Sequence, residues 1–207
     1  MTTELYFIFD SHCPWSYATT PLVNALQQAY PDMTIHLLHS AHYIGKDCAG
    51  EEQIQAATKA SGVKFGREHI RYANSPKNSI KSANLMAWMQ DKQANKQLAL
   101  LNALQAAHFV EGNPLNTKHD FNAIVEKLKL SPSNKVFKDE LSVDAENILE
   151  AIAEIQQMLG TTSFPVLVMT VNDNAIFIDH SQYLNNPKGV VTAVEQEIAA
   201  IQQPKKH

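Results

Sequence analysis

Cys13 is the residue of this 207-residue chain whose type and position most clearly suggest chemistry. It follows an apolar run at residues 5–9 and precedes Pro14, and proline is common at the first position of a helix. A thiol there lies near unpaired backbone N–H groups and the positive end of the helix dipole, which stabilise a thiolate. Ser16 follows one turn later, where its hydroxyl can donate a hydrogen bond to the sulfur. These residues predict a nucleophilic cysteine with a lowered pKa, and the alternative is an inert buried thiol.

His12 is the side chain next to this thiol, and its protonated form would favour the thiolate. A solvated loop histidine is an equally good interpretation of the same position. Asp179 and His180 would complete a hydrolase triad with Cys13 on paper, but no cysteine-protease signature surrounds them. We therefore do not expect a hydrolase.

Three histidines, His36, His39 and His42, have a spacing that resembles a metal site. Successive side chains of an extended strand alternate between its two faces, so a spacing of three separates them unless the chain bends after Leu38. We expect no metal.

The elements that must position Cys13 form a β-α-β unit. Residues 5–9 and 33–38 are short apolar runs typical of buried strands, and the apolar spacing between Pro14 and Pro31 predicts a helix. A right-handed crossover makes the two strands parallel, so both end at the same edge of the sheet.

The middle of the chain is predicted to be helical, because apolar residues recur there at three- and four-residue steps. The predicted helices cover residues 51–61, 80–91, 96–109, 120–129 and 145–159. Asp144 is the expected N-cap of the last of these. Its bulky apolar side chains are expected to form the core of this region: Phe65, Tyr72, Met86, Trp88, Met89 and Phe109.

The end of the chain predicts a β-hairpin and a helix. Residues 165–171 and 175–178 are strand-like and flank the polar turn 172–174, which indicates an antiparallel pair. An amphipathic helix is predicted over residues 187–203.

Composition narrows the function classes. The chain is 44% hydrophobic and 18% charged with a net charge of -4, so it predicts a globular protein that does not bind nucleic acid. No apolar stretch approaches the roughly 20 residues needed to span a bilayer, and the N-terminus lacks a signal-peptide pattern, so no membrane role is expected. Two cysteines are too few for a disulfide scaffold, and a cytoplasmic location is expected.

The segment Phe9-Asp10-Ser11-His12-Cys13-Pro14-Trp15-Ser16-Tyr17, with Ser163-Phe164-Pro165, resembles the DsbA-like branch of the thioredoxin superfamily over essentially the whole chain. The stretch Phe109-Val110-Glu111-Gly112-Asn113 is similar to its cytoplasmic FrnE-like members. The resemblance implies an α/β protein. Its thioredoxin fold would comprise residues 1–44 and 161–207, with a helical insertion at residues 45–160.

The same resemblance implies the roles of the site residues. Cys13 would be catalytic with Ser16 beside it, and Pro165 would be a cis-proline packed against the active-site cysteine. Substrate would lie in a groove between the insertion and the thioredoxin half. The residues expected to bind it are His12, Pro14, Trp15, Phe164 and Pro165.

One departure from the family pattern limits the chemistry. Redox members carry Cys-x-x-Cys, whereas Ser16 stands here in the place of the second cysteine. A monothiol cycle remains: Cys13 attacks a disulfide or a glutathione adduct, and an external thiol such as glutathione completes the exchange. We expect no tightly bound cofactor, with glutathione as a co-substrate and a thiol or disulfide, peptide or small molecule, as the partner.

Two alternatives stay open. Ser16-Tyr17 also resembles the motif of the glutathione-dependent kappa-class transferases and 2-hydroxychromene-2-carboxylate isomerases, which implies isomerisation or conjugation of a glutathione-linked substrate. A redox-inactive binding protein that kept only the fold is the third hypothesis.

Cys48 is most simply a spare loop thiol. It follows the second strand by about ten residues, so it could fold back toward Cys13, and a bridge requires α-carbons within about 7 Å.

Overall fold

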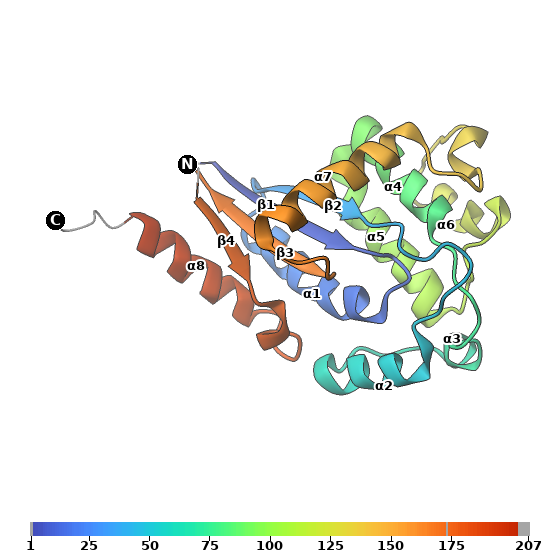
Figure 1. The fold of residues 1–207 in the computed structure, drawn as a ribbon, viewed down its shortest axis with the longest axis horizontal. Helices are drawn as coiled ribbons and strands as arrows, with labels where there is room; N and C mark the ends of the chain where they lie inside the picture. The colour runs from blue at the N-terminus through green and yellow to red at the C-terminus, as the bar shows by residue number, and fades with distance from the viewer. Residues whose placement is uncertain (1, 173, 203–207) are drawn as a thin grey trace.

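A four-stranded mixed sheet forms the centre of the molecule (Figure 1). The computed structural model describes residues 2–172 and 174–202. The strand order is β2-β1-β3-β4, with β1 at Thr3–Phe9, β2 at Thr34–His39, β3 at Val166–Val171 and β4 at Asn174–Ile178. β1 pairs in parallel with β2 and antiparallel with β3, and β3 pairs antiparallel with β4. The predicted β-α-β unit and hairpin are confirmed; Asp173 of the predicted turn lies outside the described residues.

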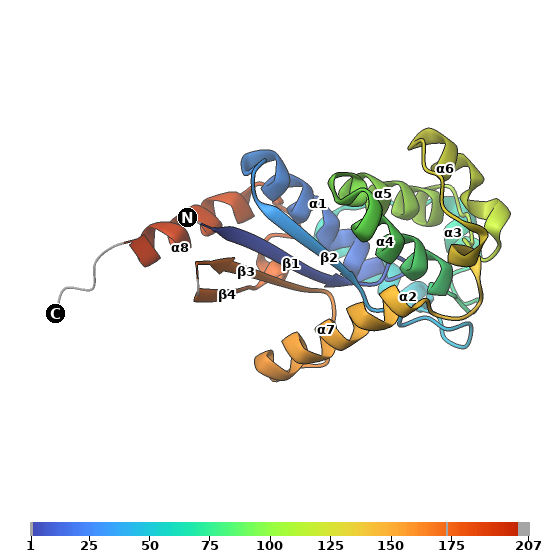
Figure 2. The ribbon, with the colours of Figure 1, turned by 90° about the horizontal axis from the view of Figure 1, so that it is seen from above.

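Helices cover both faces of the sheet (Figure 2). α1 (Pro14–Ala29) and α8 (Gly189–Gln202) lie on one face, and α7 (Val143–Leu159) lies on the other. The alternation of β1 explains this arrangement, because neighbouring side chains of a strand point to opposite faces. Phe7 and Phe9 join the core cluster under α1, while Ile8 packs in the cluster that includes residues of α7.

The region between β2 and β3 is helical. α2 (Gly50–Ser61), α3 (Arg67–Arg71), α4 (Ile80–Lys92), α5 (Gln97–Gln105) and α6 (Asn122–Lys127) precede α7, with short 3-10 turns among them. Residues 50–160 are all described and contain no strand; an isolated bridge joins Ile44 and Asn78. One core cluster contains Phe9 of the sheet together with Leu104 and Phe121 of the helical region, so the two halves share a hydrophobic core.

α7, which lies within the predicted insertion at residues 45–160, packs against both the sheet and α4 of the helical region. Ile148 and Ile152 of α7 are buried in the same cluster as Ile8 and Val166 of the sheet. The periodicity of α7 shows one apolar face but not what that face covers.

Helix ends differ from the predictions where local hydrogen bonds override periodicity. The predicted helix 96–109 ends as α5 at Gln105 and continues as the π-helix Ala106–Val110. The predicted helix 120–129 is a 3-10 turn, Lys118–Phe121, followed by the short α6. The predicted last helix, 187–203, is α8, which begins at Gly189; residue 203 lies outside the described part.

The prediction that Asp144 is the N-cap of α7 is wrong. Ser142 occupies that position, and its hydroxyl accepts a hydrogen bond from the Ala145 N–H at 3.2 Å. α7 therefore begins two residues earlier than predicted, and Asp144 lies inside its first turn.

Most of the predicted core side chains of the helical region are buried. Met86, Met89 and Phe109 are at most 1% exposed, and Trp88 and Phe65 are partly buried against the same cluster. Tyr72 is the exception at 55% exposed. No helix in the described part of the chain combines the length and apolarity needed to cross a membrane.

Candidate functional site

Cys13 is the N-cap residue of α1, and Pro14 is the first residue of that helix. The Cys13 thiol is almost fully buried, with 4% of the residue exposed. The backbone N–H groups of Trp15 and Ser16 and the Ser16 hydroxyl lie around its sulfur and act to lower its pKa, although the Cys13 side chain accepts no capping hydrogen bond from the helix. Ser16 is itself fully buried, and its Oγ accepts a hydrogen bond from the Asp10 N–H at 3.2 Å. The N-terminal turn of α1 thus surrounds the sulfur with donors.

The predicted lowering of the Cys13 pKa is nevertheless wrong for this state of the protein. Burial raises the pKa of Cys13 to about 11, although the polar hydrogens of Ser16 and Trp15 act to lower it. A thiolate removed from water loses more solvation than these donors return. The nearby Asp10 carboxylate raises the pKa further.

Asp10 is the fully buried carboxylate that joins three segments at this edge of the sheet. Its Oδ1 accepts the His12 N–H at 2.8 Å, and its Oδ2 accepts the His42 N–H at 2.8 Å and the Ser79 hydroxyl at 2.7 Å. Burial alone would raise the pKa of Asp10, but the neighbouring His39 and His12 rings and these hydrogen bonds lower it below its ordinary value. Asp10 was not among the predicted site residues, although a carboxylate directly after a buried strand is a signal that the sequence contains.

A chain of hydrogen bonds fixes the orientation of His12. The Ala41 N–H donates to His39 Nδ1 at 3.0 Å, the Ser11 N–H donates to His39 Nε2 at 3.1 Å, and Ser11 Oγ lies 2.8 Å from the same Nε2. Because the Pro114 carbonyl only accepts, His12 Nε2 carries the proton and is directed at this carbonyl at 3.4 Å, and His12 Nδ1 accepts from the Ser11 hydroxyl at 3.0 Å.

Neither expectation for His12 holds, because the ring is buried and neutral. His12 is 1% exposed, and burial lowers its pKa to about 4, against the opposing effect of Asp10. Its ring lies against that of His108, with centroids 4.1 Å apart, and His108 in turn lies 4.8 Å from His69. His12 therefore supplies no positive charge to Cys13 in this state.

Phe164 and Pro165 lie at the sheet edge from which Cys13 emerges. The β1–β3 register pairs Ile8 with Val166, so the end of β1 lies beside the start of β3. The Phe164–Pro165 peptide bond is cis. The Phe164 ring lies 4.9 Å from the ring of His42. Trp15, the remaining predicted binding residue, is partly buried and packs against the main core.

Other sequence candidates are not gathered at Cys13. Asp179 accepts hydrogen bonds from Ser181 and Gln182, whereas the polar groups around the Cys13 sulfur come from the helix that Cys13 precedes. His36 bonds to Glu4 at 2.7 Å. Among the described residues, no group of three or more His, Cys, Asp or Glu side chains could hold a metal ion.

Cys48 and Cys13 are both free thiols. Cys48 is exposed in the loop before α2, whereas Cys13 is buried. The structure thus shows no bridge between them.

Comparison with solved structures identifies the fold. No family model and no curated protein matches the sequence. Among solved structures, the cytosolic disulfide reductase DsbM from Pseudomonas aeruginosa is similar with a TM-score of 0.81 and 16% identity, covering 95% of this chain and 99% of that one. The fold is that of the DsbA-like thioredoxin proteins.

Two further structures share this fold. DsbM has also been solved with GSH, and that structure matches with a TM-score of 0.79, 16% identity and the same coverage of both chains. A 2-hydroxychromene-2-carboxylate isomerase matches with a TM-score of 0.60 and 15% identity, covering 97% of this chain and all of that one. The DsbA-like fold includes this isomerase, in agreement with both resemblances in the sequence.

Proposed function

We propose that the protein is a monothiol thiol-disulfide oxidoreductase that uses Cys13 as its nucleophile and glutathione as its co-substrate. The observation that carries this proposal is the ring of donors around the Cys13 sulfur: the N–H groups of Trp15 and Ser16 and the Ser16 hydroxyl. Such donors stabilise a thiolate once it forms. A structural thiol in an apolar core does not need them.

The exchange balances with one external thiol. Cys13 loses its proton, its sulfur attacks one sulfur of a disulfide, and the other sulfur leaves as a thiolate that takes up a proton. A glutathione thiolate then attacks the mixed disulfide at the sulfur of the bound group and releases Cys13 as a thiolate. When the bound group is glutathione, the product is oxidised glutathione, so Ser16 in place of a second cysteine does not prevent turnover.

Two findings support this assignment. A structurally similar protein is a cytosolic disulfide reductase whose structure includes GSH. Both cysteines here are free thiols, which fits a reducing compartment such as the cytoplasm. His12, Pro14, Trp15, Phe164 and Pro165 are proposed to line the substrate side of the thiol, with a peptide or small-molecule disulfide as the substrate.

The raised pKa of Cys13 favours a second candidate, a glutathione-dependent isomerase or transferase. If Cys13 stays protonated, it can donate a hydrogen bond to the sulfur of bound glutathione, which would then be the nucleophile. The similarity to an isomerase of this kind adds to this alternative.

Mass spectrometry after incubation with oxidised glutathione separates the candidates. The monothiol exchange predicts a glutathione adduct on Cys13 in the wild type and in Cys48→Ser, and none at this position in Cys13→Ser. Reduced glutathione should then remove the adduct. Absence of an adduct on Cys13, together with isomerase turnover that needs reduced glutathione, would support the second candidate instead.

Ser16→Cys tests whether the site accepts dithiol chemistry. The two sulfurs would lie one helical turn apart, within reach of a disulfide. We expect the variant to oxidise a reduced peptide that the wild type does not oxidise, measured by the loss of free thiols. Ser16→Ala is the matched control and should show no such gain.

A further inference from the structure

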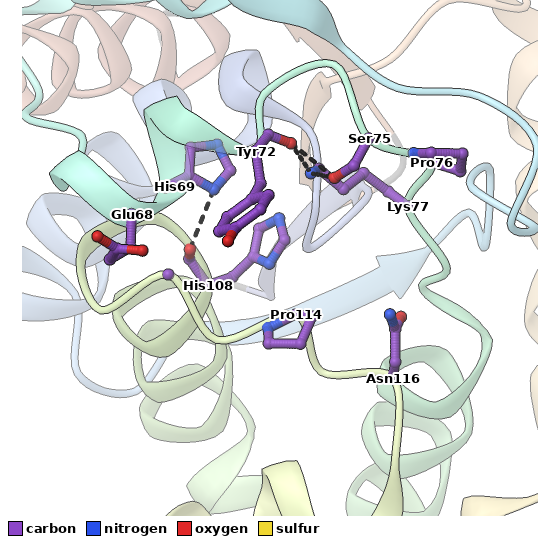
Figure 3. Close-up of a pocket in the computed structure, with 10 residues that line it drawn as sticks. Glu68, His69, Tyr72, Ser75, Pro76, Lys77, His108, Pro114 and Asn116 are labelled. Atoms are coloured by element: carbon purple, nitrogen blue, oxygen red, sulfur yellow. Dashed lines mark hydrogen bonds between the residues drawn. The ribbon is translucent and has the colours of Figure 1, made fainter.

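A cavity of about 260 Å³, drawn in Figure 3, is lined in part by His69 and His108. The rings of these two residues and of His12 contact one another in a row, which we call the histidine stack. Neither Cys13 nor Pro165 is among the residues that line the cavity. Its walls come from α3, the turn that follows α3, the π-helix and the loop after it, and they include His69, Tyr72, Lys77 and His108. Roughly nine water molecules occupy this volume in liquid water, and a small organic molecule needs a similar space.

Lys77 supplies a buried positive charge without a counter-ion. Lys77 is 8% exposed, and its Nζ donates to the Tyr72 carbonyl at 2.6 Å and to Ser75 Oγ at 2.9 Å, as Figure 3 shows. No carboxylate of the described residues lies within ion-pair distance of it. The ammonium group has three N–H donors, so one remains available. Because an unpaired buried charge is costly, an anion beside Lys77 would be bound favourably.

His69 and His108 supply hydrogen-bond acceptors. His69 Nδ1 lies 3.1 Å from the His108 carbonyl, and His108 Nδ1 lies 2.9 Å from the Asn113 carbonyl. A carbonyl only accepts, so both Nδ1 atoms carry the proton and each neutral ring keeps a lone pair on Nε2. His108 Nε2 is buried and has no hydrogen-bond partner among the described residues.

The charge of Lys77 helps to keep these rings neutral. Burial lowers the pKa of His69 to about 4, and the nearby ammonium of Lys77 acts in the same direction. The pKa of His108 also lies well below its ordinary value, mainly through burial. The cavity therefore combines the cation of Lys77 with uncharged acceptors, while Glu68, which also lines it, is an exposed carboxylate paired with Arg71. His108 belongs to the π-helix Ala106–Val110, a feature frequent at functional sites.

We propose that this cavity binds a small carboxylate that carries an O–H or N–H donor on the neighbouring carbon, that is, an α-hydroxy or α-amino acid. The carboxylate would lie at Lys77, and the donor would meet the Nε2 lone pair of His69, with His108 in the wall behind. This site does not depend on the chemistry of Cys13.

Isothermal titration calorimetry on the full-length Cys13→Ser protein tests the site without any contribution from the thiol. The probes are L-lactate and L-serine, with propionate as the carboxylate that lacks the donor and ethanolamine as the molecule that lacks the carboxylate. We expect lactate, serine or both to bind at least about tenfold more tightly than propionate and ethanolamine, because each control leaves one polar group of the cavity unpaired. Which of the two binds distinguishes a hydroxy acid from an amino acid.

A charge variant and its control locate the binding. Lys77→Met should weaken binding at least tenfold, whereas Lys46→Met, which removes an equal charge from an exposed loop position nearby, should leave it unchanged. Histidine side-chain nitrogen NMR on the protein with Lys77 intact gives a second measurement that does not depend on the folding of a variant. The Nε2 signal of His69 should move on ligand addition.

Three results would overturn the proposal. They are no binding of lactate or serine at millimolar concentration, equal binding of propionate, or an equal loss in Lys46→Met. Because the assay protein lacks the Cys13 thiol, none of these results bears on the oxidoreductase activity, and failure of that activity would leave this site unaffected.

Discussion

At the residue scale, the reactivity of Cys13 depends on the balance between desolvation and hydrogen bonding. Cys13 as a residue is 4% exposed, and polar hydrogens of Trp15 and Ser16 lie around its sulfur. Desolvation is the larger effect in the substrate-free protein, so the thiol is protonated at neutral pH. A bound substrate that carries its own charge or donors would change this balance, but in its absence the thiol should react slowly.

The first prediction concerns the pH dependence of this reaction. In Cys48→Ser, the rate of alkylation by iodoacetamide should rise about tenfold per pH unit from pH 7 upward and level off only near pH 11, because the thiolate is the reacting form and the pKa of Cys13 is about 11. At pH 8, unfolding in urea should speed the reaction, since an unfolded thiol has a pKa of about 8.5.

Cys13→Ser provides the reference, since only the exposed Cys48 then reacts. A rate for Cys13 that already levels off below pH 8 would contradict a raised pKa and would restore the activated thiolate expected from the sequence.

At the scale of the elements, the sequence predicts what depends on local pattern. The strands appear as apolar runs, and Pro14 marks the start of α1, so the position of Cys13 at the helix N-terminus follows from neighbouring residues alone. The chemical state of Cys13 does not follow from them. It depends on burial by segments distant in the chain, and a sequence pattern does not measure solvent access.

The histidine stack shows the same limit. His12 and His108 are separated by 95 residues in the chain and bring their ring centroids within 4.1 Å. Their neutrality arises from this contact and from burial, and neither is encoded in local spacing. The cavity beside them was therefore outside the reach of the sequence analysis, although Lys77 and Tyr72 were visible as a polar and an aromatic residue between two helices.

The second prediction tests the cap of α7. Ser142→Ala should lower the free energy of unfolding by about 1 kcal/mol, because it removes the hydroxyl that accepts the Ala145 N–H. Asp144→Ala should have a smaller effect, since the Asp144 carboxylate lies in the first turn, where it interacts with the helix dipole and does not cap the helix. Urea denaturation of the two variants measures the difference. A larger loss of unfolding free energy in Asp144→Ala than in Ser142→Ala would show that Asp144 is the N-cap after all, as predicted from the sequence.

At the scale of the whole molecule, buried polar groups join the two halves. Asp10 at the end of β1 accepts hydrogen bonds from His42 after β2 and from Ser79 at the start of α4. His12 approaches Pro114 and His108 in the helical region. Because these groups lie between the halves, their protonation state affects the stability of the entire fold and not only that of one element.

The last prediction follows from the histidines. The pKa values of His12 and His69 are lowered to about 4, chiefly by burial, and those of His39 and His108 are also lowered. The unfolded chain binds protons at these rings below about pH 6.5 while the folded protein does not. Their contribution to stability is thus complete above pH 6.5 and is lost as the pH falls toward the folded values.

Urea denaturation between pH 7.5 and 5 measures this loss. Each ring that is neutral in the folded protein and protonated in the unfolded chain contributes a slope of at most about 1.4 kcal/mol per pH unit, so His12 and His69 alone predict about 2.4 kcal/mol per unit near pH 5. His69→Gln should reduce that slope by the contribution of about one proton, because glutamine can still donate to the His108 carbonyl but does not titrate. The slope, unlike the stability itself, does not depend on how much the substitution destabilises the fold. His119→Gln, at an exposed position, is the control, and an equal change of slope in that variant would show that the buried stack is not the source of the acid sensitivity.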